Sequence, residues 1–102
     1  MQLSPRELER LQLFTAAELA RRRIRNGILL SHPECVALAC DVALEAARAG
    51  RSYDEVCDSV RGLLDPDTLL PGVAELLDAP VQVEVAFGDG SRLVSLAGLV
   101  RR

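Results

Sequence analysis

The sequence contains few aromatic residues and no lysine. Aromatic residues form 3% of the 102 residues, tryptophan is missing, and all twelve basic residues are arginine, which we interpret as a compositional bias. Hydrophobic residues nevertheless form 49% of the chain, which excludes an intrinsically disordered protein. The core must therefore consist of Leu, Val, Ile and Ala, and the length allows one domain, 1–102, with a modest core.

Excess positive charge and long apolar runs are also lacking. The formal net charge is −3 and the isoelectric point is near 5.1. Proteins that bind nucleic acid generally need a basic surface, so this balance argues against that class. No stretch approaches the roughly 18 apolar residues of a membrane span. We therefore expect neither nucleic acid nor a membrane as a partner.

The cysteines and the N-terminal residues indicate a cellular location. Cys35, Cys40 and Cys57 are odd in number, and none forms a C-x-x-C pair. The stretch MQLSPRELERL is charged and lacks the apolar segment of a signal peptide. We therefore expect a cytoplasmic protein with reduced, mostly buried thiols. A redox or metal-binding role for these thiols is the alternative.

Three helix starts are marked by the same motif, a serine followed three residues later by a glutamate. In such a capping box the serine oxygen accepts an amide of the first turn, and the glutamate accepts the amide of the serine. The motif occurs at Ser4–Glu7, Ser31–Glu34 and Ser52–Glu55. Together with the stop signals Gly27, Gly50 and Asp65-Pro66, it predicts helices over residues 5–25, 32–49 and 53–64.

Apolar periodicity predicts which side of each helix is buried. In the first helix the predicted stripe is Leu8, Leu11, Thr15 and Leu19, with Phe14, Ala17 and Ala20 beside it. In the second helix it is Val36, Ala39, Val42, Ala43 and Ala46, and in the third Val56, Val60, Leu63 and Leu64. Because the linkers are short, neighbouring helices should fold back on one another.

The remaining sequence predicts a short helix at about 73–77 and one β-hairpin. Strands are expected at about 81–88 and 91–96, because apolar and polar residues alternate there and Asp89-Gly90 suits a tight turn. A lone hairpin is barely stable in water, so its apolar face must lie on something else. The predicted fold is α+β and mostly α, a three-helix domain with a short extra helical turn and a C-terminal antiparallel hairpin.

His32 and Cys35 are the strongest catalytic candidates. They lie one turn apart near a predicted helix N-terminus, where a thiolate is somewhat favoured. The chain has one histidine, so no multi-histidine metal site can form. Cys40 is five residues from Cys35 and lies on a different face. We therefore interpret His32 as a residue of the helix entry or of a subunit boundary, and both cysteines as small apolar residues.

The basic run at residues 21–25 leaves three alternatives open. It could be a solvated helix end, where positive charge complements the helix dipole. It could form salt bridges across a subunit interface, or it could bind nucleic acid, although no aromatic residues are interleaved for stacking on bases. Glu18 is spaced to pair with Arg22.

The remaining polar motifs have no catalytic spacing. Asp65, Asp67 and Asp78 do not form a calcium loop, and Gly88-Asp89-Gly90 is a turn without the following helix that a phosphate cradle needs. Neither a P-loop nor a G-x-S-x-G motif is present. We therefore predict no catalytic, cofactor-binding or metal-binding residues in this chain.

Five stretches, taken in order, resemble the gamma subunit of bacterial urease over nearly the whole sequence. They are LSPRELERLQLFTAAELARRR (3–23), HPECVAL (32–38), EAARAGRS (45–52), PGVAELL (71–77) and VQVEVAFGDGSRLVSL (81–96). The resemblance implies a non-catalytic structural subunit of urease, a nickel-dependent hydrolase that converts urea to ammonia and carbamate. It also implies alpha and beta subunits as partners in a trimer of heterotrimers, with nickel and all catalytic residues in the alpha subunit and no cofactor in this chain.

Some positions depart from the family pattern. The expected E-G-A-R-D-G reads EAARAG at 45–50, and the tail at 98–102 lacks the usual His and Pro. These changes also fit a divergent paralogue. The alternative function is a free-standing helical interaction or regulatory module that keeps the gamma-like fold and has no urease role.

Overall fold

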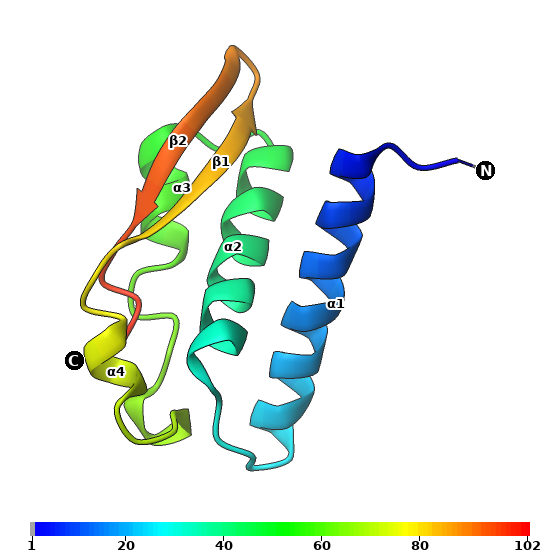
Figure 1. Ribbon diagram of the computed structural model, residues 1–102. Helices are drawn as coiled ribbons and strands as arrows, with labels where there is room; N and C mark the ends of the chain where they lie inside the picture. Colours follow the sequence, from blue (N-terminus) through cyan, green and yellow to red (C-terminus); the bar gives the residue numbers. More distant parts are fainter. Residues whose placement is uncertain (1) are drawn as a thin grey trace.

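The computed structural model describes residues 2–102 and places one long helix beside a second, with a hairpin and smaller elements beyond it (Figure 1). The elements are α1 (Pro5–Arg25), α2 (His32–Arg48), α3 (Tyr53–Ser59), the 3₁₀ turn η1 (Pro66–Thr68), α4 (Val73–Leu76), β1 (Val81–Phe87) and β2 (Gly90–Leu96). This confirms the predicted fold class, α+β and mostly α.

The capping boxes begin the helices where the sequence predicts. The Ser4 hydroxyl accepts the Glu7 amide at 3.1 Å, and the Glu7 carboxylate accepts the Ser4 amide at 3.0 Å. Ser52 and Glu55 make the same exchange at the start of α3. At the start of α2 the Glu34 carboxylate accepts the Ser31 amide at 2.8 Å. These short-range bonds satisfy amides that would otherwise lack partners.

Helix α2 is the centre of the molecule, since α1, α3 and β1 all pack against it (Figure 1). Its buried residues are mostly small: Cys35, Ala37, Leu38, Ala39, Cys40, Asp41, Ala43 and Ala47. Small side chains allow neighbouring elements to approach closely, so a core almost free of aromatic rings can still be well packed.

One face of the hairpin packs against the helices, which supply the support that a lone hairpin lacks. Val83 pairs with Val94 and Val81 with Leu96, and Val85, Val94 and Leu96 are fully buried. Helices α2 and α3 lie on this side. Leu93 points the other way and is 62% exposed. The hairpin is therefore a two-stranded layer stabilised by the helices.

The turn lies one residue earlier than predicted. Phe87 pairs with Gly90, so the turn residues are Gly88 and Asp89 rather than Asp89 and Gly90. The observed register pairs Val83 with Val94, whereas a turn at Asp89 and Gly90 would pair Val85 with Val94. Gly90, with φ +125°, adopts the backbone conformation that other residues avoid.

Helix α3 ends at Ser59 and not at Leu64 as predicted. Beyond it, backbone groups bind the C-terminal tail: the Gly62 amide donates to the Gly98 carbonyl at 2.7 Å and the Leu64 amide to the Leu99 carbonyl at 2.8 Å. These bonds replace helical ones, while Leu64 stays buried. The ends of α2 and α4 differ from the predictions by one residue each, within the fraying of helix ends.

The C-terminal tail is an integral part of the core despite its unusual sequence. Leu99 is 1% and Val100 7% exposed, and the Arg101 amide donates to the Leu64 carbonyl at 2.7 Å. The tail therefore joins the segment after α3 to the end of the hairpin.

The predicted buried stripe of α1 is wrong. Leu8, Leu11 and Leu19 are exposed, and the fully buried residues of this helix are Ala17 and Ala20. At 100° per residue the two sets lie nearly opposite one another. The leucine stripe faces away because α1 packs mainly on α2 and uses its alanine side (Figure 1).

Glu34 should make the stability of the fold depend on pH. Burial raises its pKa, but hydrogen bonds from Ser31 and the Arg23 guanidinium outweigh this and hold the pKa below the usual 4.5. The stabilisation is present above the pKa of an unfolded glutamate and is lost as pH falls through the lower folded-state pKa.

We therefore expect Glu34→Gln to reduce the free energy of unfolding by about 1 kcal/mol at pH 7. In this variant the free energy of unfolding should also fall less steeply as the pH is lowered. Urea unfolding of both proteins at low micromolar concentration, followed by circular dichroism from about pH 6 to 3, measures this. An equal decline in the two proteins would contradict it.

Leu99→Ala tests the tail. Removing a fully buried leucine side chain should lower the free energy of unfolding by about 2–4 kcal/mol. The matched control is Leu93→Ala on the outside of the hairpin, which should change it by less than about 0.5 kcal/mol. Urea unfolding compares the unaltered protein with the two variants. Similar changes in the free energy of unfolding for both variants would mean that the tail does not stabilise the core.

Candidate subunit interface

The structure does not give the cysteines a reactive environment. Burial, with a smaller contribution from Glu34, raises the pKa of Cys35 to about 11, and burial also raises the pKa of Cys40. The hypothesis that the helix start favours a Cys35 thiolate is therefore wrong. Cys57 is half-buried and unbonded, and His32 is half-buried at the start of α2.

The acidic candidates have separate local roles. Asp65 accepts the Asp67 amide at 2.9 Å and begins η1. Asp78 pairs with Arg102 near the C-terminus. Within residues 2–102, no group of three His, Cys, Asp or Glu side chains lies close enough to hold a metal ion. The absence of a catalytic site remains a prediction.

The basic run is divided between solvent and the α1–α2 contact. Arg21 pairs with Asp41 at 2.6 Å, and Arg23 pairs with Glu34. Glu18 pairs with Arg21 at 2.5 Å and not with Arg22 as predicted. Arg22 and Arg25 are exposed. Much of the run therefore joins two helices of one chain, an alternative that the sequence reasoning did not include.

Sequence reasoning also missed Asp41, the acceptor of these contacts. Asp41 is 2% exposed, and both Arg10 and Arg21 reach it from α1. The available signal was a lone carboxylate inside the apolar run VALACDVAL, residues 36–44. Such a residue requires charged partners, because burying an unpaired carboxylate is costly.

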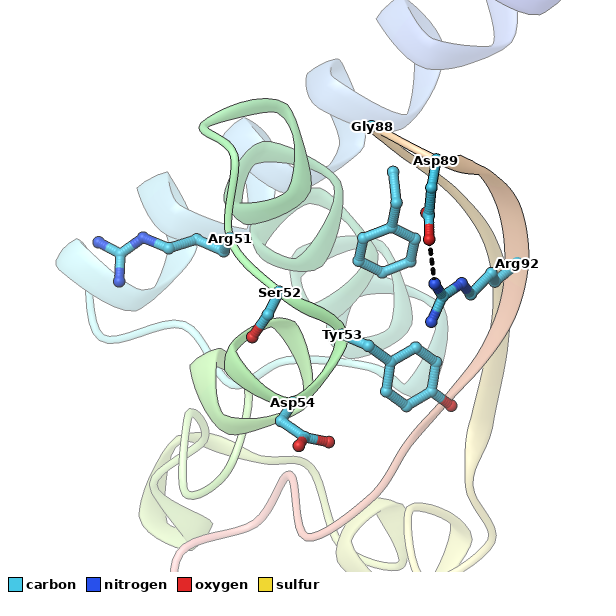
Figure 2. Close-up of a pocket in the computed structure, with 8 residues that line it drawn as sticks. Arg51, Ser52, Tyr53, Asp54, Gly88, Asp89 and Arg92 are labelled. Atoms are coloured by element: carbon cyan, nitrogen blue, oxygen red, sulfur yellow. Dashed lines mark hydrogen bonds and ion pairs between the residues drawn. The ribbon is translucent and has the colours of Figure 1, made fainter.

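A hollow of about 550 Å³ lies between the hairpin turn and the start of α3. Arg92 extends across it toward Tyr53 and pairs with Asp89 (Figure 2). Its guanidinium carbon lies 5.9 Å from the centre of the Tyr53 ring and 5.5 Å from that of Phe87. This cation–π contact attaches the turn to α3. The Arg92 guanidinium is therefore already engaged by groups of the same chain.

The most unusual surface is the outer face of α1, which we define as Leu8, Leu11, Phe14 and Leu19. These side chains are 43–49% exposed and recur along the helix. The inner face, Leu13, Ala17 and Ala20, meets α2 and is much smaller. The larger apolar side of this helix has no partner among the described residues.

A second apolar surface, the end patch, consists of Ile28, Leu29 and Leu70. All three are exposed. The Leu30 amide donates to the Thr68 carbonyl at 2.8 Å, and the Leu70 amide to the Leu30 carbonyl at 2.9 Å. This backbone pairing brings two loops together at the end of the molecule opposite the hairpin turn (Figure 1).

Apolar surfaces gathered in this way are typical of sites where proteins bind one another. No helix within residues 2–102 combines the length and the apolar character needed to cross a membrane. The fold and its exposed apolar surfaces are therefore those of a small helical protein of the docking or subunit class.

Comparison with known proteins specifies the family. The family model described as "Urease, gamma subunit" matches residues 1–100. "Urease subunit gamma" of Photorhabdus laumondii is 46% identical over 96 residues, covering 94% of this chain and 95% of the relative. "Urease subunit gamma" of Natronomonas pharaonis is 48% identical over 101 residues, covering 99% and 92%. The chain belongs to the urease gamma-subunit family, as the resemblance in its sequence predicts.

Proposed function

We propose that this chain is a structural, non-catalytic subunit of a cytoplasmic urease that hydrolyses urea to ammonia and carbamate. The observation that carries the proposal is the match to the gamma-subunit family along residues 1–100. The high coverage of both relatives supports it. The same matches favour this role over that of a free-standing helical module.

The partners in this proposal are an alpha subunit, which holds nickel and the catalytic residues, and a beta subunit. The three chains form a heterotrimer that is repeated as a trimer. The residues described here do not fit a nickel site of their own, since no suitable cluster exists within 2–102 and the chain has one histidine.

The outer face of α1 and the end patch are the proposed contact surfaces. At about 25 cal/mol per Å² of apolar area, burying the exposed half of a leucine side chain contributes about 1 kcal/mol. The four side chains of the outer face therefore supply about 4 kcal/mol toward assembly. The chain positions neighbouring subunits by this burial and performs no chemical step.

Co-expression with the genes that neighbour it tests the function. We expect the chain to co-purify in fixed ratio with a large metal-binding amidohydrolase, and the purified assembly to hydrolyse urea. Produced alone and concentrated well above the low micromolar range, the chain should be poorly soluble or self-associated, because its apolar surfaces lack partners. A monodisperse, cooperatively melting monomer that recovers no large subunit would contradict the proposal.

Leu11→Arg tests the contact surface. A charge at the centre of the outer face should lower recovery with the large subunit at least about tenfold, because the guanidinium would be buried without a partner. The matched control, Leu93→Arg, makes the same substitution at an exposed position on the hairpin and should change recovery less than about twofold. Equal losses of recovery in both variants would mean that the interface does not lie on the outer face of α1.

A further inference from the structure

Asp41 is the one buried charged residue of the described chain, and it lies where α2 meets α1. Arg10 approaches one of its oxygens at 2.9 Å, and Arg21 approaches the other at 2.6 Å. The two arginines are eleven residues apart on α1, about three helical turns. Asp41 is therefore held from both sides along the axis of the facing helix.

Neighbouring ion pairs extend this contact along α2. Arg10 also pairs with Glu45 at 2.9 Å, one turn beyond Asp41, and Arg23 pairs with Glu34 near the start of α2. Contacts at three levels of one helix constrain both the position of α1 along its axis and its rotation about that axis. The Arg10–Asp41 contact is ionic only, since the Nη1 and Oδ1 atoms are not aligned as a hydrogen bond.

Apolar burial alone favours a different rotation of α1. The inner face offers two fully buried alanines and the half-buried Leu13, whereas the outer face offers three leucines and a phenylalanine. Turning the helix by about half a revolution would bury more apolar area. Buried ion pairs contribute little net stability, but they can specify one arrangement among competing ones.

We propose that Asp41 is an orientation lock, which holds the alanine side of α1 against α2 and thereby keeps the outer face available to a partner. In its absence the leucine stripe would compete for the same contact within the chain. The lock is a property of the chain by itself. Its consequence for assembly rests on the proposed function.

Thiol labelling of the full-length chain, produced without partners at low micromolar concentration, tests the lock. The background is Cys57→Ser, which removes the half-exposed thiol and leaves the two buried ones. Reporter cysteines replace either Leu11 on the outer face or Leu13 on the inner face. A maleimide reagent followed by mass spectrometry gives the rate of labelling at each reporter.

With Asp41 present, the Leu11→Cys reporter should label about tenfold or more faster than the Leu13→Cys reporter. Asp41→Leu, which replaces the charge with an apolar side chain, should reverse this order. Asp41→Glu keeps the charge and should preserve the original order. Asp58→Asn, which removes the exposed Arg61–Asp58 pair away from α1, should have no effect.

Three labelling outcomes would overturn the lock. If Asp41→Leu makes both reporters label rapidly, α1 has simply detached and Asp41 only stabilises the fold. If the order is unchanged, or if the two reporters label equally with Asp41 present, Asp41 does not set the rotation. Because no partner is used, these results are independent of the urease role.

Recovery from co-expression supplies the second readout. Asp41→Leu should lower recovery with the large subunit about tenfold, as expected when the contact face is lost, while Asp41→Glu restores it. Normal recovery with Asp41→Leu would overturn the lock. A chain that recovers no large subunit even with Asp41 present would instead count against the proposed function and leave the labelling result standing.

Discussion

The contact of Asp41 with Arg10 and Arg21 determines how the longest helix sits on the rest of the molecule. Helix α1 packs mainly on α2, and its fully buried residues are two alanines. So small an apolar contact defines the rotation of a helix poorly, whereas charged groups at fixed positions define it well. The exposure of the leucine stripe follows from this arrangement.

The remainder of the fold shows how a chain with few aromatic residues builds a core. Small residues of α2 let the hairpin and α3 approach closely, and valines and leucines of the strands fill the layer between them. The C-terminal tail closes the structure through Leu99 and Val100. Closely fitted aliphatic side chains thus replace the area that larger rings would bury.

Features set by neighbouring residues could be predicted from the sequence, and features set by distant ones could not. The capping boxes at Ser4 and Ser52 and the existence of the hairpin depend on short-range bonds and alternation. The end of α3 depends on a tail more than thirty residues away. The rotation of α1 could not be predicted, because periodicity identifies the most apolar side of a helix but not whether that side is buried within the chain.

The two faces of α1 divide the work of folding and assembly between them. The alanine face and its ion pairs hold the helix in place within the chain, so the leucines of the outer face are not needed for folding. Those leucines remain able to contribute their burial to association, at the cost of a surface that promotes aggregation until a partner covers it. A helix that buried its leucines internally would give a more soluble chain with less surface left for binding. The Asp41 carboxylate selects the arrangement in which the alanine face of α1, and not its leucine face, packs against α2.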